Sequence, residues 1–343
     1  MLLGGAAGLA WLRFLYPRSA AAGAGREVEI KIAPGKTLES VVEELEREHM
    51  VAQPAFFRAY MQLRGADKAL RQGRFRVSDD LRPGELARRL ARNLGPSWVR
   101  VTVPEGWHRF AIAEKLEAWG VCPKEEFLRV AARSAPPVRL RKPRVGVEGY
   151  LFPDTYEFRV ESSAREVLKK MLDQWRAKTM RLLETYPAQL AQRQRELGWG
   201  LDEVVTLASI VEKESALAEE RPVIAGVFLN RLRSPRFRPK RLQADPTVSY
   251  GCIASGESIP SCKGFRGTIT KAMLADKSNP FNTYQIEGLP PAPIANPGLA
   301  SLRAVLMPQN HEYFYFVARG NRAHRFSKTL GDHNRAVSPL RGR

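Results

Sequence analysis

A single glutamate lies in the apolar stripe of a predicted amphipathic helix. The segment 201–217 reads LDEVVTLASIVEKESAL, with apolar residues at helical spacing and Asp202 as a credible N-cap. At about 100° per residue, Glu214 falls within the stripe, and Glu212 lies about 160° away around the helix. Burial raises the pKa of a carboxyl group, which makes it a usable general acid near neutral pH. Glu214 is therefore the candidate catalytic residue, and the alternative is a structural glutamate bonded to a neighbouring backbone group or arginine.

Two later segments carry polar and aromatic side chains that suit a carbohydrate. The segment 241–251 reads RLQADPTVSYG and, if extended, would present alternate residues on one face. The segment 279–298 contains five prolines, so we expect an ordered loop there rather than a helix or a central strand. The side chains concerned are Gln243, Asp245 and Thr247 in the first segment and Asn282, Tyr284 and Asn296 in the second. Because rings stack on sugar faces and amides pair with hydroxyls, a glycan groove is one interpretation, and ordinary turn chemistry is the other.

Other catalytic chemistries lack their sequence motifs. The five histidines include no pair spaced four residues apart, and the sequence has no H-E-x-x-H motif, phosphate-binding loop or G-x-S-x-G elbow. We therefore expect no metal and no cofactor. The three cysteines form no C-x-x-C pair. The spacing of Cys252 and Cys262 suits a small disulfide-closed loop, and two free thiols fit it equally well.

Basic residues greatly outnumber acidic ones along the 343 residues. Lys and Arg number 55 against 36 Asp and Glu, which gives a formal net charge of +19. Such a surplus favours polyanionic partners: nucleic acid, an anionic membrane face or an acidic polymer. No fold signature or stacking motif for nucleic acid occurs, so we expect no nucleic-acid partner. A hydrophobic share of 44% excludes a disordered chain, a collagen-like fibre and a multi-span membrane protein.

The elements around these residues predict an α+β fold. Residues 26–34 alternate polar and apolar side chains and predict a strand. Thr37 is the expected cap of a helix that continues to Met50, and Pro54 opens a second helix. The further elements that we expect are a strand at 73–77, a helix at 83–93, and strands at 98–106 and 313–318.

The N-terminus begins with an apolar run. Residues 2–12 read LLGGAAGLAWL, which is shorter than the roughly 20 apolar residues that a spanning helix needs. The run is either a frayed apolar terminus or the last half of a truncated membrane anchor, and we favour the anchor. Residues 17–25, PRSAAAGAG, would then form a small-residue linker.

Seven motifs occur in order over most of the chain. They are EGYLFPDTYEF (148–158), LASIVEKES (207–215), VFLNRL (227–232), LQADPTVSYG (242–251), NTYQIEGLPPAPIANPG (282–298), YFVA (315–318) and HRFSKTLGDHN (324–334). Together they resemble the endolytic murein transglycosylases of the YceG-like family. Two features depart from the family pattern, namely a longer turn at 234–240 and the loop between Cys252 and Cys262.

The resemblance implies a domain organisation. We expect a small LysM-like module followed by a mixed α/β catalytic domain, behind an apparently truncated N-terminal membrane anchor. The expected boundaries are 1–25 for the partial anchor and linker, 26–96 for the LysM-like glycan-binding module, 97–338 for the YceG-like catalytic domain and 339–343 for a basic tail. The protein would span the cytoplasmic (inner) membrane once, with its catalytic domain on the outer, periplasmic side.

The resemblance also implies an activity. The family's catalytic glutamate is the second one in E-K-E, which is Glu214 here. With the polar segments above, the substrate-binding candidates are Gln243, Asp245, Thr247, Asn282, Tyr284, Asn296 and His324. The enzyme would be a lyase that cleaves the MurNAc-β-1,4-GlcNAc bond of nascent glycan strands. It would leave 1,6-anhydroMurNAc ends and terminate strand elongation.

Partners follow from the same resemblance and from the charge. We expect peptidoglycan glycan strands, peptidoglycan synthases (penicillin-binding proteins) and an anionic membrane surface. The alternative function is a non-catalytic cell-envelope protein that binds peptidoglycan or another polyanion.

Overall fold

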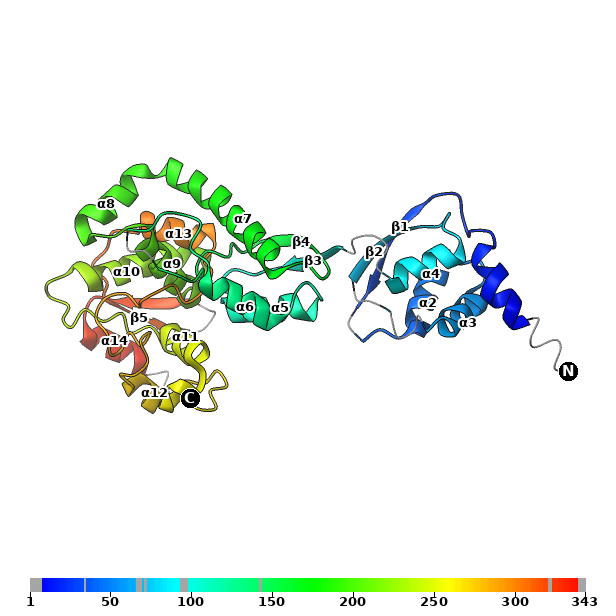
Figure 1. Cartoon of the computed structure of the whole chain (residues 1–343). Coiled ribbons are helices and arrows are strands. Elements are labelled where there is room, and N and C mark those ends of the chain that lie inside the picture. The colour runs from blue at the N-terminus through cyan, green and yellow to red at the C-terminus, as the bar shows by residue number, and fades with distance from the viewer. Residues whose placement is uncertain are drawn as a thin grey trace. The chain divides into compact units, whose positions relative to one another are not determined.

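The computed structural model describes residues 8–33, 35–65, 70, 73–92, 98–141, 144–319 and 323–338. Helices and strands are mixed along the chain, which confirms the expected combination of α and β structure (Figure 1). The chain forms two compact units. The first comprises Met1–Thr102, Ala113–Glu126 and Thr155–Ala164, and the second comprises Val103–Ile112, Phe127–Asp154 and Arg165–Arg343. The expected basic tail, 339–343, and residues 1–7 of the expected anchor lie outside the described residues.

The first unit contains a four-stranded antiparallel sheet with helices beside it. Its elements are η1 (Trp11–Leu15), η2 (Tyr16–Arg18), β1 (Glu27–Ile32), α2 (Leu38–Arg47), α3 (Pro54–Leu63), β2 (Gly73–Ser78), α4 (Pro83–Arg92), β3 (Trp98–Thr102) and β4 (Thr155–Arg159). The strand order is β1-β2-β3-β4. The division into units groups β3 and β4 with this sheet, and the sequence-based boundary at residue 97 stays a prediction.

Local sequence accounts for the helices of this unit. The backbone N–H of Ser40 donates to Thr37 Oγ1 at 3.3 Å, so Thr37 caps α2 as expected. The buried residues of α2 recur at helical spacing and form one apolar stripe: Leu38, Val41, Val42 and Leu45. Pro54 occupies the first turn of α3, where a missing N–H costs no hydrogen bond.

The segment expected to be anchor and linker makes contacts within the first unit. Tyr16 is buried and lies beside the rings of Trp11, Phe56 and Tyr60. The Asp79 carboxylate accepts from the backbone N–H of Gly25 and its neighbour at 2.7 and 2.9 Å, which holds the end of the linker. Among the described residues, no helix is long and apolar enough to cross a membrane.

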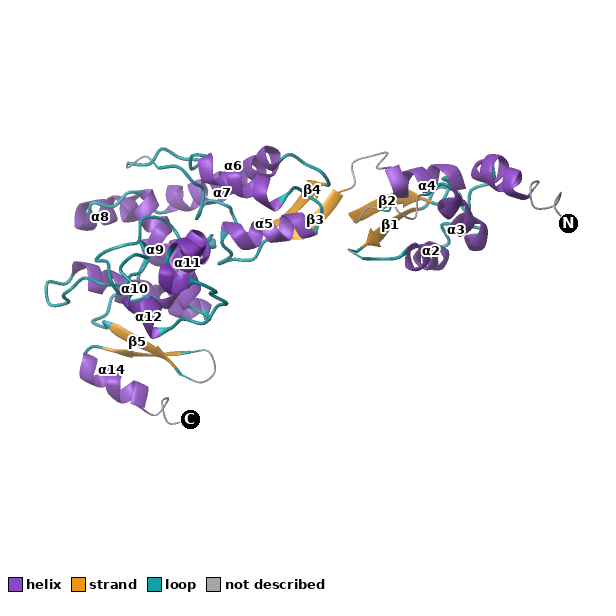
Figure 2. Ribbon diagram, turned by 60° about the horizontal axis from the view of Figure 1, so that its bottom comes forward, coloured by secondary structure: helices purple, strands orange, loops and turns teal. Residues whose placement is uncertain are grey.

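The second unit is mainly helical. Its elements are α7 (Ala164–Thr185), α8 (Pro187–Leu197), α9 (Leu201–Glu214), η3 (Ala218–Glu220), α10 (Arg221–Arg233), α11 (Asp245–Ser255), η4 (Gly256–Ser258), η5 (Pro260–Cys262), α12 (Lys271–Ala275), α13 (Leu299–Leu306), β5 (Tyr315–Ala318), β6 (His324–Ser327) and α14 (Leu330–Val337). Helices α5 (Arg109–Ala118) and α6 (Lys124–Arg133) contribute residues to both units. Helix α9 packs against α10 and α13, and the antiparallel pair β5 and β6 lies beside α14 (Figure 2).

A disulfide joins Cys252 on α11 to Cys262. The spacing of the two residues left a disulfide and two free thiols open, and the structure contains the disulfide. Both sulfurs are buried in a small apolar cluster with Val248, Ile259 and Met273. The bond therefore closes the loop after α11 and holds it against the body of the second unit.

Removing this disulfide is expected to lower the free energy of unfolding by about 3 kcal/mol, since a short closed loop restricts the unfolded chain by that amount. Urea denaturation of the Cys252→Ser/Cys262→Ser double variant measures the loss. A thiol reductant should destabilise the wild type by a similar amount and leave the double variant unaffected. Equal stability of both proteins with and without reductant would show that the bond contributes nothing.

Candidate active site

Helix α9 brings Glu214 to the edge of the core. Every residue from Val204 to Val211 is buried, so the helix runs through the interior. Glu214 is the last residue of the helix and stays partly accessible to solvent. A carboxylate at a helix C-terminus meets the negative end of the macrodipole, which disfavours its charged form. The helix thus carries an acidic group from the core to a largely enclosed position that solvent still reaches in part.

The pKa of Glu214 is raised to about 7, mainly by burial and also by the negative charge of Asp245, while the guanidinium of Arg231 opposes the rise. At neutral pH the carboxyl group is therefore divided between its acid and its base form. That division suits a group that must first donate a proton and then accept one.

Arg231 is a buried cation beside this carboxyl group. Its Nε donates to the Phe314 carbonyl at 2.7 Å, and Nη1 donates to the Leu242 carbonyl. The guanidinium also lies over the rings of Phe237 and Tyr315, at 5.4 and 5.6 Å from their centroids. Burial lowers the pKa of Arg231 to about 10, so it keeps its charge at neutral pH. These contacts hold a positive charge in a fixed place near Glu214.

Asp245 and Tyr284 form a hydrogen-bonded pair in the same neighbourhood. The Tyr284 hydroxyl donates to Asp245 Oδ1 at 2.6 Å. Burial and the neighbouring carboxylate raise the pKa of Tyr284, so its hydroxyl stays protonated. The electrostatic influence of Glu214 and Arg231 reaches Tyr284 as well. We call Glu214, Arg231, Asp245 and Tyr284 the Glu214 cluster.

Residues 241–251 are not extended, so the condition for Gln243, Asp245 and Thr247 to share one face is not met. Helix α11 begins at Asp245, with Pro246 in its first turn, where proline favours a helix. Gln243 precedes it with a left-handed φ of 53°, and its N–H donates to the Thr283 carbonyl at 3.1 Å. Gln243 and Asp245 are exposed and Thr247 is buried, so the three residues do not share one face.

Thr247 and Asn282 are fully buried, so neither side chain faces solvent where a glycan could meet it, and their role in substrate binding stays a prediction. Thr247 Oγ1 lies 2.9 Å from Thr283 Oγ1 and 2.7 Å from the Ala244 carbonyl. The Asn282 amide donates to three carbonyl groups at 2.9 to 3.1 Å, those of Met273, Leu274 and Asp276. Asn282 Oδ1 accepts from the N–H of Tyr284 at 3.0 Å, so this residue positions Tyr284 instead.

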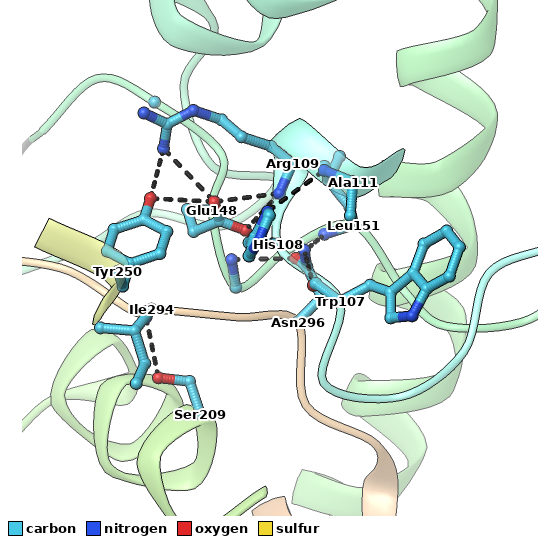
Figure 3. A network of polar contacts seen from close by, with 12 residues as sticks. Trp107, His108, Arg109, Ala111, Glu148, Leu151, Ser209, Tyr250, Ile294 and Asn296 are labelled. Atoms are coloured by element: carbon cyan, nitrogen blue, oxygen red, sulfur yellow. Dashed lines mark hydrogen bonds and ion pairs between the residues drawn. The ribbon is translucent and has the colours of Figure 1, made fainter. Parts of the chain in front are cut away.

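Asn296 is likewise fully buried and is the centre of a polar network (Figure 3). Its Oδ1 accepts from the N–H groups of Gly149 and Leu151 at 2.9 and 2.8 Å. Its Nδ2 donates to the Trp107 carbonyl and to Glu148 Oε1, both at 2.9 Å. All hydrogen-bonding capacity of the amide is used within the protein, which favours a structural role for Asn296, and substrate binding by this residue stays a prediction.

Glu148 belongs to the same network and was not among the site residues predicted from the sequence. Both of its oxygens accept from the Arg109 N–H at 3.1 Å, and Oε2 also accepts from the Tyr250 hydroxyl at 2.9 Å (Figure 3). Burial raises the pKa of this carboxyl group, and Arg109 opposes the rise. The signal available in the sequence was a lone glutamate among apolar residues in VEGYLF, 147–152.

The proline-rich loop is tied to the helix that carries Glu214. Ser209 on α9 accepts from the N–H of Ile294 at 3.0 Å (Figure 3). Gly149 has a φ of 90°, and a Cβ there would lie 2.5 Å from Pro293 and 2.8 Å from Val205. Only glycine fits this close approach. The loop, the EGYLF segment and α9 therefore form one rigid support.

His324, the last predicted site residue, and Glu212, which the helical wheel separates from Glu214, have partners outside the Glu214 cluster. His324 Nδ1 is 2.6 Å from Glu220 Oε2, and its ring contacts the Phe316 ring edge-on at 5.4 Å. The Glu212 side chain is only 4% exposed and pairs with Arg221 at 2.8 Å. Glu212 also accepts from the Gly298 N–H at 3.0 Å, so it serves a separate structural contact.

A cavity of about 680 Å³ lies on the C-terminal side of α10 and has several aromatic residues in its lining. Phe237, Phe314 and Tyr315 line it, and Phe237 stacks on Phe314 with 5.6 Å between ring centroids. Phe237 and Tyr315 also face the Arg231 guanidinium. The volume is within the range of small-ligand sites, and the aromatic walls suit the faces of sugar rings.

Comparison with known proteins points to one family. The YceG-like family model matches residues 30–339. The endolytic murein transglycosylase of Bacillus subtilis (strain 168) is 28% identical over 324 residues, covering 90% of this chain and 83% of that protein. The endolytic murein transglycosylase of Streptococcus pneumoniae serotype 2 (strain D39) is 26% identical and matches 85% of this chain but only 54% of its own length. The crystal structure of a YceG-like protein from Listeria monocytogenes has a TM-score of 0.66 at 27% identity, covering 90% of this chain and 98% of that one.

Proposed function

The chain belongs to the YceG-like family, and on that premise we propose that it is an endolytic murein transglycosylase. Its two named relatives carry that activity in their names, and the match covers most of the chain. The reaction is a lyase reaction on peptidoglycan. It breaks the MurNAc-β-1,4-GlcNAc bond within a glycan strand and leaves a 1,6-anhydroMurNAc end.

Glu214 performs both proton transfers in the proposed mechanism. The protonated carboxyl group donates to the glycosidic oxygen as the bond to C1 breaks. The resulting carboxylate then accepts the proton of the MurNAc 6-hydroxyl as that oxygen attacks C1. The substrate supplies its own nucleophile, so one carboxyl group suffices where ordinary glycosidases use two. No water is consumed.

The other members of the Glu214 cluster affect the protonation of Glu214 and could contact the substrate. Asp245 holds negative charge near Glu214 and keeps it protonated to higher pH, whereas Arg231 stabilises the carboxylate once the proton has left. Asp245 and Gln243 are exposed and Tyr284 is partly so, which leaves them able to contact the glycan. The cavity beside Phe237 and Tyr315 would hold a sugar unit of the strand.

The observation that carries this proposal is a partly accessible carboxyl group with a pKa of about 7 in a cluster of fixed charges. Digestion of purified sacculi with the protein, followed by mass spectrometry of the soluble fragments, tests it. New 1,6-anhydroMurNAc ends are the expected result. Reducing MurNAc ends would indicate a hydrolase, and intact sacculi with bound protein would favour the non-catalytic binder.

The pH dependence of the reaction should report the ionisation of Glu214. The group must start protonated, so the rate of fragment release should fall as pH rises above about 7. Asp245→Asn removes the negative charge that raises the pKa of Glu214. The pKa falls, and the decline in rate should begin at lower pH than in the wild type.

Glu219→Gln is the matched control for this measurement, because Glu219 is exposed and its loss also removes one negative charge. The Glu219→Gln variant should have the same pH profile as the wild type. An equal shift of the pH profile in both variants would reflect the change in net charge alone. An unchanged profile in Asp245→Asn would show that Asp245 does not affect the pKa of Glu214.

The cellular location, the N-terminal module, the membrane anchor and the partners are also part of the proposal. Murein as substrate implies a cell-envelope location. Within it, we infer that residues 26–96 form a LysM-like module that contacts glycan strands, and that the N-terminal apolar run belongs to a single membrane anchor. An anionic membrane surface would then attract part of the basic surplus, and penicillin-binding synthases would supply the nascent strands that the enzyme terminates.

A further inference from the structure

A second cavity lies between α6 and α7, within the second unit. Its volume is about 580 Å³. The charged residues that line it are Arg129 and Arg133 on α6 and Arg165, Lys169, Asp173 and Arg176 on α7. None of its lining residues belongs to the Glu214 cluster or to the polar network around Asn296. It is therefore a separate feature of the molecule.

Positive charge in this cavity exceeds negative charge among the described lining residues. Lys169 pairs with Asp173 at 2.6 Å, and Asp173 is the one acidic residue in the described lining. The four arginines are exposed. The described part of the chain offers none of them an ion-pair partner. The spacing along each helix, with Arg129 four residues before Arg133, directs the guanidinium groups toward the same space.

The floor of the cavity is apolar. Leu168 is buried, and Val130, Leu172 and Pro137 are partly buried around it. A flat anionic surface would reach the rim arginines but would leave this hollow empty. A compact anion with a small organic part fills both the charged rim and the apolar floor.

The guanidinium groups favour a ligand whose charge is carried by phosphate groups. Their planar fork forms paired hydrogen bonds with phosphate oxygens, and four of them exceed what one singly charged carboxylate can neutralise. We propose that the cavity between α6 and α7 binds a compact ligand with two linked phosphate groups, such as a diphosphate ester. The site goes beyond murein cleavage, and its occupancy does not depend on Glu214.

Calorimetric titration of the full chain at about 0.1 M salt tests the site. Inorganic pyrophosphate is expected to bind once per chain, and orthophosphate and malonate more weakly, because each presents less charge or a different geometry. Hexyl diphosphate should bind more tightly than pyrophosphate if the apolar floor contacts the organic part. Equal affinity of these two probes would assign the site to free polyphosphate anions, and binding of malonate as tight as pyrophosphate would overturn phosphate recognition.

Two double variants separate the cavity from bulk charge. Arg133→Gln/Arg165→Gln should weaken pyrophosphate binding about tenfold or more, since it removes two charge-assisted contacts. Arg181→Gln/Arg195→Gln removes the same charge from exposed positions outside the cavity and should change the affinity less than about twofold. Equal weakening in both would overturn the proposal. Binding to phosphatidylglycerol vesicles without any affinity for pyrophosphate would also overturn it, in favour of a membrane surface.

Murein cleavage provides an independent readout. Both double variants keep the Glu214 cluster intact and should release fragments from sacculi at the wild-type rate. Failure of the wild type to cleave sacculi would refute the proposed function and leave the titration result standing.

Discussion

Replacing Glu214 with glutamine should reduce murein cleavage by at least the 10²- to 10⁴-fold that one acid–base group typically contributes. Glutamine keeps the shape and hydrogen-bonding capacity of the side chain but neither donates nor accepts the catalytic proton. Here one group serves both proton transfers, so the loss should be close to complete. Folding should survive, because an uncharged amide suits an enclosed position at least as well as a carboxylate.

Release of 1,6-anhydroMurNAc fragments from sacculi measures the activity, and thermal unfolding checks the fold. Glu219→Gln should behave as the wild type in both assays, since Glu219 is exposed and outside the Glu214 cluster. Glu212→Gln is unsuitable as a control, because it disturbs the buried ion pair with Arg221. Wild-type activity in Glu214→Gln would refute the assigned role.

Asn296→Ala should lower the free energy of unfolding by on the order of 4 kcal/mol, because four buried hydrogen-bonding groups lose their partner at about 1 kcal/mol or more each. Glu148 is among these groups; it would lose one donor and keep those from Arg109 and Tyr250. Urea denaturation measures the change. Activity should fall only in proportion to the folded fraction, with an unchanged KM.

Asn296→Asp is the informative companion variant. It keeps acceptor oxygens for the N–H groups of Gly149 and Leu151 but loses both donors and places a second carboxylate beside Glu148. We therefore expect it to be destabilised near neutral pH and to regain stability as pH falls and a carboxyl group takes up a proton. Full stability of Asn296→Ala with a raised KM would restore the role of substrate binding.

Buried polar residues marked the limit of sequence reasoning at this site. Asn282, Asn296 and Thr247 were expected to bind substrate because amides and hydroxyls suit sugars, yet all three are satisfied inside the protein. The same donors and acceptors serve a glycan or a backbone equally well. For Asn296, and for the contact of Thr247 with Thr283, the partner lies more than 30 residues away along the chain. Asn282, by contrast, bonds to groups within nine residues of itself.

Glu212 illustrates the same limit on a helix. The helical wheel separated it from Glu214, and the structure gives the two carboxyl groups different partners. The wheel placed Glu212 about 160° from Glu214, on a flank of the helix outside the apolar stripe. Arg221 and the backbone of Gly298 enclose that flank, so Glu212 is buried too. A wheel describes one helix and contains nothing about what packs against it.

The sequence by itself determined the features that arise from local periodicity: helix α9 with Glu214 in its apolar stripe, the Thr37 cap of α2 and the strand β5. Each depends on neighbours within a few residues, and the repeat of a helix or strand is set by backbone geometry. Tertiary structure alone decided that α11 begins at Asp245, that Arg231 and Tyr284 approach Glu214, and that Glu148 meets Asn296. Those contacts join segments far apart in the chain, and only the packing of the folded unit brings their charges and hydrogen-bonding groups together.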